Sequence, residues 1–291
     1  MSSSSVEATL SVVIGSAGPG MALEACLSGL EPQRDGVEVL VCEGQKSPTE
    51  LRTRFPWACF VERPGGLVPE LWSEGIARAT GEIVALTIAP MLAAPNWIET
   101  IREHHRRFDV VAGAIEPGLG LRLVDWAEYL CRYAKDMLPF EGHRCLDLPG
   151  DNASYKRPLL ERMRELYEDG FWEPVVHRRL ADEGVALWHT PEIVVRQGRS
   201  AGARLFWRQR LAHGRHYGRE RGAEFGRGRN LAGVLASPLV PLLLSLRVLR
   251  QVARKRRHGA RAFLALPLIL AFNVAWAIGE ARGHLETLRG R

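Results

Sequence analysis

The sequence predicts an α/β fold built around a sheet that contains parallel strands. Near the N-terminus, Leu10–Ile14 has the composition of a strand, Met21–Leu30 has apolar residues at helical spacing, and Gly36–Val41 is a second strand. Strand, helix and strand in this order form a unit with a crossover connection. Farther on, the apolar run Ile83–Thr87 follows Gly81 and precedes a proline-containing loop, which is typical of a strand buried in a parallel sheet.

Composition and charge indicate a globular part followed by a basic, apolar C-terminal part. The chain has 291 residues, 46% of them apolar, and a net charge of +6. Arginines concentrate at 196–229 and 247–261, beside apolar stretches, which favours an anionic membrane surface over nucleic acid as the partner. The five cysteines form no C-x-x-C pair, as expected for buried thiols in a reducing compartment. Without a recognisable signal peptide, we expect the globular N-terminal part to face the cytoplasm.

The remaining elements continue the alternation of strands and helices. We expect the strand Ala58–Val61, the helix Glu70–Ala79, the helix Trp97–Phe108, the strand Asp109–Ala114, the helix Val124–Met137 and the closing strands Val185–Trp188 and Ile193–Val195. Ligands of such sheets bind at the carboxyl ends of the strands. A functional site would therefore border the loop Ile88–Pro95, which follows a central strand.

One long segment carries a family resemblance. Gly81–Ile101 reads GEIVALTIAPMLAAPNWIETI and resembles the central signature of family 2 glycosyltransferases, GEIVAFTDDD…P.WLE. Leu10–Ser16 and Val37–Gln45 are similar to the first two strands of that family, VSVVIPTYN and VEVIVVDDGS. The resemblance covers Leu10–Val195. It implies a GT-A fold, a Rossmann-like mixed sheet flanked by helices that binds a nucleotide-diphosphate sugar.

The resemblance implies a donor site at the ends of the first strands. Its residues in this sequence would be Gly15, Ser16, Glu43, Ser73 and Ala89. Glu43 takes the place of the family's second-strand acid, which contacts the base or ribose, although a solvated loop glutamate is the simpler alternative. The family's Arg-Asn pair is replaced by Trp72-Ser73, so the expected donor pocket is atypical.

The acidic triplet that holds a metal ion in the family is replaced by Ile88, Ala89 and Pro90. Mg²⁺ and Mn²⁺ need carboxylate oxygens, so we predict no metal ligands here, and a divalent cation would have to be bound in a non-standard way. Two explanations fit this loss. Arginines from the second half could offset the charge of the leaving diphosphate. Alternatively, catalysis has been lost and the chain is a membrane-associated binding or scaffold protein of the same fold.

Two further segments resemble the acceptor side of the family. Leu148–Tyr155 is similar to the segment G.N.AYRR, which implies acceptor-side roles for Asp151, Asn152 and Ser154; an Asx turn and helix cap are the alternative. In Glu168–Glu183, alignment on the family's ED…RLxxxG pattern places the acidic pair on Trp172-Glu173.

Glu173 is therefore the predicted catalytic base, because inverting transfer needs a base within reach of the acceptor hydroxyl. A helix N-terminus keeps such a carboxylate ionised; a purely capping role is the alternative. His177 falls one helical turn after Glu173 and could orient it, unless it is a plain surface histidine.

The C-terminal part has two expected roles. In the family the region after the base closes over the diphosphate, and Arg210, Arg215 and His216 are best placed to replace the metal. The apolar stretches Leu231–Leu246 and Ala262–Gly279 are short for spanning helices, which need about 20 residues. With the basic loop 247–261 between them, we favour half-inserted or re-entrant helices over a spanning hairpin or buried soluble helices.

Together these inferences divide the chain at 1–9 (disordered), 10–195 (GT-A domain), 196–230 (Arg-rich interfacial helical linker) and 231–291 (membrane-associated helices). They predict an inverting glycosyltransferase at the cytoplasmic membrane. It would use a nucleotide-diphosphate sugar and a hydroxyl of a lipid-linked or cell-envelope glycan. A scaffold without turnover is the alternative, and an RNA-binding module that uses the Arg-rich segment is a weaker third reading; we expect no nucleic-acid partner.

Overall fold

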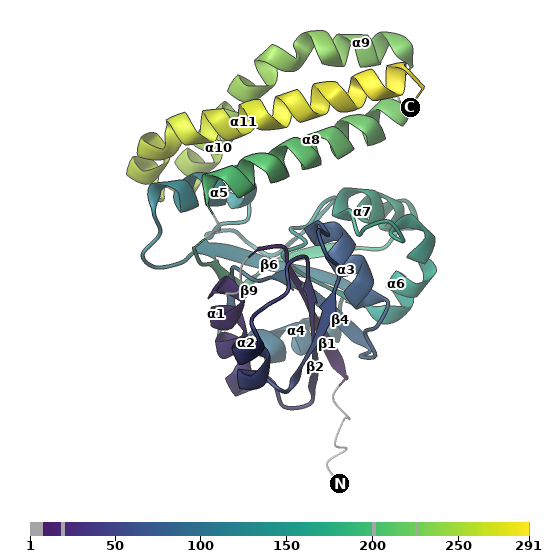
Figure 1. Ribbon diagram of the computed structural model, residues 1–291, viewed down its shortest axis with the longest axis vertical. Helices are drawn as coiled ribbons and strands as arrows, with labels where there is room; N and C mark the ends of the chain where they lie inside the picture. The colour runs from purple at the N-terminus through teal and green to yellow at the C-terminus, as the bar shows by residue number, and fades with distance from the viewer. Residues whose placement is uncertain (1–7, 19–20, 200–201, 225, 291) are drawn as a thin grey trace. The chain divides into compact units, whose positions relative to one another are not determined.

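The computed structural model describes residues 8–18, 21–199, 202–224 and 226–290. The chain forms two compact units, which we call the sheet unit and the helical unit (Figure 1). The sheet unit comprises the chain up to Gly118 together with Asp136–Gly198, and the helical unit comprises Leu119–Lys135 and the chain from Arg199. Most of the segment 1–9, expected to be disordered, lies outside the described residues.

The sheet unit contains one mixed sheet. Its strands are β1 (Leu10–Ser16), β2 (Val37–Glu43), β3 (Ala58–Glu62), β4 (Ile83–Ile88), β5 (Met91–Ala93), β6 (Val110–Pro117), β7 (His143–Cys145), β8 (Asn152–Lys156) and β9 (Leu187–Gln197). They lie in the order β3-β2-β1-β4-β8-β6-β9-β5, and β7 pairs with β9. The predicted strands are all present, and the two predicted closing strands form one strand, β9, whose pairing with β6 shifts register.

Strand β8 sets where the functional residues gather. It runs antiparallel to both β4 and β6, whereas β1, β2 and β4 are mutually parallel and β6 is parallel to β9. The carboxyl ends of β1, β2, β4, β6 and β9 therefore share one edge of the sheet, which we call the carboxyl edge. Because β8 runs the opposite way, its first residue, Asn152, pairs with Thr87 at that edge.

Helices cover both faces of this sheet. They are α1 (Met21–Leu30), α2 (Thr49–Arg54), α3 (Val68–Ile76), α4 (Trp97–His105), α6 (Arg157–Arg162) and α7 (Glu173–Asp182), with short 3-10 turns at Glu31–Gln33 and Arg164–Leu166. Helix α3 approaches β1 so closely that a Cβ at Gly75 would lie 2.2 Å from Val13 Cγ1. On the other face, Trp97 of α4 donates a hydrogen bond to Asn152 Oδ1 at 2.8 Å.

The helical unit consists of α5 (Leu123–Tyr133), α8 (Ala203–Glu224), α9 (Arg227–Ala236), a 3-10 turn (Ser237–Leu239), α10 (Val240–Lys255) and α11 (Gly259–Leu288). Helix α11 packs against the other four helices (Figure 1). The sequence boundaries placed the α5 segment with residues 10–195, whereas in the structure it clusters with the C-terminal helices.

Glycines bring the backbones of α8 and α11 into contact. On α8, Gly214, Gly218 and Gly222 recur at every fourth position, and a Cβ at Gly218 would lie 2.2 Å from Glu280 O. On α11, a Cβ at Gly279 would lie 2.2 Å from Leu211 O, and one at Gly283 would lie 2.3 Å from Arg215 O. Small residues at this spacing let two helices pack backbone to backbone.

Two helical segments of this unit are long and apolar enough to cross a membrane, judged by length and composition. They are Arg227–Lys255, with 29 residues, and Gly259–Leu288, with 30 residues. In the most apolar window of each, 17% and 44% of the residues are buried. The predicted apolar stretches thus belong to helical segments that extend past them at both ends.

The α8–α11 contact predicts that alanine substitution lowers stability at one glycine and not at another. Gly218→Ala should lower stability by about 1–3 kcal/mol, since the added methyl group collides with the Glu280 carbonyl of a rigid helix. Gly228→Ala in α9 is the matched control, because a Cβ there meets nothing within 4 Å and alanine favours helix. Thermal unfolding in detergent should show a lower Tm for the first variant only. Equal Tm values for both variants would contradict the close packing.

Candidate functional site

The carboxyl edge collects polar residues of the sheet unit that lie within one residue of a strand end. They are Ser16 on β1, Glu43 on β2, Thr87 on β4, Glu116 on β6 and Gln197 on β9, with Asp151 directly before β8. All six are at least nine-tenths buried. Parallel strands end together at this edge, which explains why residues distant in sequence lie along one line.

Glu43 is a buried carboxylate held from two sides. Its Oε1 accepts a hydrogen bond from the backbone N–H of Ser47 at 3.0 Å. Its Oε2 forms an ion pair with Arg52 of α2, which also contacts Glu62 Oε1 at 2.9 Å. Glu43 is therefore not a solvated loop side chain, and Arg52, which sequence reasoning did not single out, fixes its orientation.

Two hydroxyl groups at the carboxyl edge have no hydrogen-bond partner among the described residues. They are Ser16 Oγ and Thr87 Oγ1, both buried. Ser16 is the register partner of Glu43 across β1 and β2, so the two side chains lie on the same face. A buried hydroxyl without a partner is unfavourable by about 1–3 kcal/mol, so these are groups that a bound polar ligand or a water molecule would satisfy.

The predicted donor residues near α3 make their polar contacts with backbone carbonyls. Trp72 is buried, and its Nε1 donates a hydrogen bond to Thr87 O at 2.8 Å. Gly15 gives it room, because a Cβ at Gly15 would lie 3.3 Å from that nitrogen. Ser73 Oγ lies 3.4 Å from Glu168 O, so this hydroxyl faces the loop before α7. Ala89 is buried, and its N–H donates to Gly15 O.

The residues after β4 do not fit a divalent cation. Ile88 and Ala89 are buried apolar side chains, Pro90 follows them, and none carries an oxygen ligand on its side chain. Within the described ranges, no group of three or more His, Cys, Asp or Glu side chains is arranged to hold a metal ion. Any step that needs a metal bound in the family's standard manner therefore has no ligand set in this part of the chain.

The Glu173 carboxylate fits at the carboxyl edge because residue 150 is a glycine and leaves room for it. Glu173 is the first residue of α7, and a Cβ at Gly150 would lie 2.2 Å from Glu173 Oε1. Gly150 precedes Asp151, and Asn152 then pairs with Thr87 at the end of β4. The Glu173 carboxylate is thus next to the strand end that the sequence predicted to border the site. The α7 N-terminus favours its ionised form.

His177 lies behind Glu173 and connects two other side chains. Its ring is fully buried, with Nε2 2.7 Å from the Tyr155 hydroxyl oxygen and Nδ1 3.1 Å from Asp147 Oδ1. The backbone N–H of Leu148 also donates to Nδ1 at 3.3 Å, so Nε2 is the ring nitrogen that pairs with the Tyr155 hydroxyl. Burial, followed by the nearby charges of Glu173 and Asp147, raises the pKa of Tyr155 well above its usual range. The hydroxyl therefore stays protonated.

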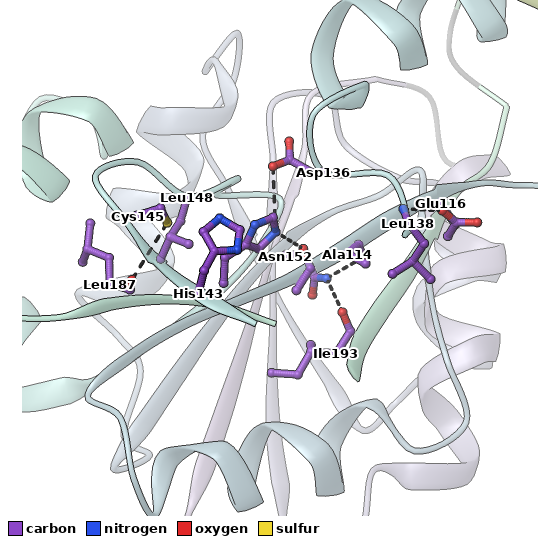
Figure 2. Close-up of polar contacts among 12 residues, drawn as sticks. Ala114, Glu116, Asp136, Leu138, His143, Cys145, Leu148, Asn152, Leu187 and Ile193 are labelled. Atoms are coloured by element: carbon purple, nitrogen blue, oxygen red, sulfur yellow. Dashed lines mark hydrogen bonds and ion pairs between the residues drawn. The ribbon is translucent and has the colours of Figure 1, made fainter. Parts of the chain in front are cut away.

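Of the predicted acceptor-side residues, Asn152 and Ser154 direct their side chains into the core. Asn152 accepts from Trp97 and donates to Ala114 O at 2.9 Å and Ile193 O at 3.1 Å (Figure 2). Ser154 Oγ lies 2.8 Å from His105 Nε2. The amide oxygen and the amide nitrogen of Asn152 thus both have protein partners. Asp151, in contrast, lies at the carboxyl edge beside Gly150.

Glu116 was not found by sequence reasoning. It is the penultimate residue of β6 at the carboxyl edge, is buried, and accepts the Leu138 N–H at 2.9 Å (Figure 2). In the same region His189 Nε2 lies 3.2 Å from Gly113 O and 3.8 Å from Asp136 Oδ1, and Phe140 stacks on the His189 ring at 4.3 Å. A carboxylate directly after a buried strand was the available signal, as for Glu43, but the predicted strand stopped at Ala114.

The three residues proposed to stabilise the diphosphate are on α8, where they contact α11. Arg210 donates to Asn273 Oδ1 at 2.9 Å and lies 4.4 Å from the Trp276 ring centroid. Arg215 Nε lies 2.8 Å and 3.1 Å from the two Glu286 carboxylate oxygens. Burial lowers the pKa of His216 to about 4, so this ring is neutral at physiological pH.

Comparison with solved structures gives two informative neighbours. A mannosyltransferase from Pyrobaculum calidifontis, PcManGT, solved with GDP-Man and Mn²⁺, is similar with a TM-score of 0.55 and 17% identity, over 95% of this chain and 88% of that chain. GalNAc-T7, solved with UDP, GalNAc and Mn²⁺, is similar with a TM-score of 0.51 and 14% identity, over 67% of this chain and 44% of that chain.

No protein-family model and no curated protein sequence matches this chain. At identities this low, the structural similarity is evidence for the fold alone. It confirms the predicted fold class: a GT-A-type mixed sheet flanked by helices, with two apolar C-terminal helices.

The Tyr155–His177–Asp147 contacts predict unequal effects of two conservative changes. Tyr155→Phe should destabilise the sheet unit by about 1–3 kcal/mol, because it leaves a buried ring nitrogen without its partner. Asp147→Asn keeps an acceptor oxygen at a half-exposed position and should cost less than about 0.5 kcal/mol. Denaturant unfolding followed by fluorescence measures both. A larger loss for Asp147→Asn would contradict this arrangement.

Proposed function

We propose that this chain is an inverting glycosyltransferase. It would transfer a sugar from a nucleotide diphosphate to a hydroxyl of a lipid-linked or cell-envelope glycan at the cytoplasmic membrane. The GT-A-type fold supports this assignment, as do the two solved neighbours, which bind GDP-Man or UDP at the corresponding fold. Glu43 and the buried hydroxyls of Ser16 and Thr87 supply polar groups for the nucleotide at the carboxyl edge.

The observation that carries this proposal is the position of Glu173. Its carboxylate lies against Gly150 at the edge where β4 ends, as a base must when the donor sits at that edge. In the proposed step, Glu173 accepts the proton of the acceptor hydroxyl, whose oxygen forms a bond to the anomeric carbon. The bond from that carbon to the diphosphate breaks on the opposite side. The nucleoside diphosphate leaves with the bonding electron pair.

The leaving diphosphate needs positive charge, which the residues after β4 do not supply. Arg210, Arg215 and His216 remain our proposed groups for this role, with arginine suited to bidentate contact with phosphate oxygens. Two facts weigh on this assignment. Arg215 already contacts the Glu286 carboxylate and Arg210 already contacts Asn273 and Trp276, and the low pKa of His216 makes its ring neutral.

A catalytically inactive, membrane-associated binding or scaffold protein is the second candidate. It is favoured by the apolar filling near the donor residues: Trp72, Ile88 and Met91 are each at least 96% buried where the family carries polar or acidic groups. Arg52 and the Ser47 N–H also occupy both oxygens of Glu43. Such a protein would keep the fold and lose the transfer.

Nucleotide-sugar binding separates the two candidates. We expect GDP- or UDP-linked sugars to raise the Tm of the full chain, and the rise should survive EDTA because the standard metal ligands are missing. The measurement is a thermal shift series with each donor, with Mn²⁺ and with EDTA. No shift by any donor would favour the scaffold. A shift abolished by EDTA would contradict metal-independent binding.

Two substitutions test the base. With the donor that binds best, Glu173→Gln should lower kcat by at least about a hundredfold while leaving donor binding intact. Gly150→Ala should also lower kcat, because the new methyl group displaces the flexible Glu173 carboxylate without moving backbone. Gly29→Ala is the matched control, since its Cβ meets nothing within 4 Å. Unchanged turnover in Glu173→Gln would remove Glu173 as the base.

A further inference from the structure

The helical unit exposes an unusually apolar surface on its long helices. On α9, α10 and the 3-10 turn between them the exposed residues are Leu231, Leu235, Leu239, Leu242, Leu243 and Leu246, and on α11 they are Phe263, Leu264, Leu270, Val274 and Ile278. We call these residues the apolar stripe. Several are more than half exposed, such as Leu235 at 73% and Phe263 at 75%. Contiguous exposed apolar side chains of this number mark a surface that binds a partner or a membrane.

The stripe on α11 faces away from the charged helices of the unit. Gly279 and Gly283 of α11 contact α8, as does Trp276, whose carbonyl lies 2.3 Å from a Cβ built at Gly214. Val274 and Ile278 are each two positions from Trp276, and two residues correspond to a rotation of about 200° around a helix. The exposed apolar side of α11 is therefore opposite the side that packs on α8.

Helix α8 lies along the second half of the apolar stretch of α11. Phe206 packs on Phe272 with ring centroids 4.7 Å apart, and Gly218 contacts Glu280, so the two helices run in the same direction. The exposed residues of α8 on this stretch include Arg204 and Arg208. In a bilayer, Arg204 and Arg208 would therefore lie at the same depth as the adjoining part of α11.

Helix α5 lies along the first half of α11 in a similar way. Trp126 packs on His258 at 4.8 Å between ring centroids, and Cys131 Sγ lies 3.9 Å from Ile269 O. This helix carries Arg122, paired with Asp125, and Arg132, which lies 3.8 Å from Glu128. The apolar stretch of α11 is thus accompanied along its length by helices with ionised side chains.

These contacts argue against a spanning hairpin. If Arg227–Lys255 and Gly259–Leu288 crossed a bilayer, the charged residues of α5 and α8 would be carried into the hydrocarbon beside them. Ionised side chains facing lipid at that depth are strongly unfavourable. A helix pair lying in the plane of the membrane avoids this, since the apolar stripe enters the acyl region while α8 stays on the water side.

The charge at the turn of the hairpin identifies the lipid. The segment from the end of α10 to the start of α11 is basic, with Arg247, Arg250, Arg254, Lys255, Arg256, Arg257 and Arg261. Arg247, Arg250 and Arg254 are exposed on α10, next to Leu243 and Leu246 of the apolar stripe. Basic residues adjoining an apolar face complement anionic headgroups, and each contributes roughly a fivefold gain in binding to an anionic surface.

We infer that the helical unit is a monotopic anchor for a leaflet rich in anionic phospholipid. The apolar stripe inserts into one leaflet, the arginines of the turn bind phosphate headgroups, and neither end of the hairpin crosses to the other side. This inference concerns how the membrane partner is bound and is independent of sugar transfer. Either one can fail while the other is confirmed.

The inference is tested by finding the side of the membrane on which two glycine positions lie. Gly226 precedes α9 and Gly259 begins α11, and a Cβ at either meets nothing within 4 Å, so Gly226→Cys and Gly259→Cys are matched probes of the open end and the turn. Both are made with the exposed Cys59 changed to serine. A membrane-impermeant maleimide is added to spheroplasts and to inside-out vesicles of the expressing bacterium.

We expect both cysteines to react in inside-out vesicles and neither in spheroplasts. Reaction of one on each side would overturn the inference in favour of a spanning hairpin. Leu242→Cys, in the apolar stripe, should react only after detergent is added. Full reaction of this cysteine without detergent would show that lipid does not cover the stripe.

Vesicle binding tests the lipid class. The purified chain should float with phosphatidylcholine–phosphatidylglycerol vesicles more strongly than with phosphatidylcholine alone. Changing Arg247, Arg250 and Arg254 to glutamine should weaken binding to the anionic vesicles roughly a hundredfold, as three lost fivefold contributions predict. Changing the exposed Arg106, Arg144 and Arg164 of the sheet unit is the matched control. An equal loss of binding to anionic vesicles in the two triple variants would overturn the inference. A chain that forms a soluble dimer and floats with neither kind of vesicle would also overturn it.

Discussion

The antiparallel insertion of β8 between β4 and β6 is the constraint on which the candidate site depends. Were β8 parallel to its neighbours, the Gly150–Asp151 turn would lie at the opposite edge of the sheet. Instead the turn lies beside Thr87, and the Glu173 carboxylate packs against Gly150. One strand direction thus brings the predicted base to the edge where Ser16 and Glu43 end their strands.

The helical unit depends on a different constraint, the direct contact of the α8 and α11 backbones. Glycines at every fourth position let Gly218 approach Glu280 O, and the Arg210–Asn273 and Asn273–Ser245 hydrogen bonds link α8, α11 and α10. This packing buries a face of α11 made mainly of small residues and leaves large apolar side chains such as Phe263 and Leu264 exposed. The same arrangement explains both the exposed leucines and the cost of placing this unit across a bilayer.

Much of the fold was predictable because it depends on local patterns. Buried strands such as Ile83–Ile88 are continuous apolar runs, and glycine and proline mark their ends. Less predictable were features fixed by tertiary contacts. The α5 segment was assigned to the sheet domain from its position in the chain, and the extension of β6 to Pro117 hid Glu116 from the sequence analysis.

The candidate site was predictable in outline and not in detail, for a physical reason. A strand end can be predicted from sequence, so Glu43 was placed correctly at the end of β2. Which partner a side chain chooses depends on elements far away in sequence. Asn152 binds Trp97 and Ile193, and His177 binds Tyr155 and Asp147, and no spacing rule indicated these pairs.

The central claim is that the carboxyl edge accepts a nucleotide sugar although the residues after β4 cannot chelate a metal. Hydrogen–deuterium exchange of the full chain in EDTA, with and without a GDP- or UDP-linked sugar, tests it directly. We predict slower exchange in the segments 43–47, 88–95 and 149–152, which follow or precede the strands of that edge. Unchanged exchange in all three segments at saturating donor would contradict the claim.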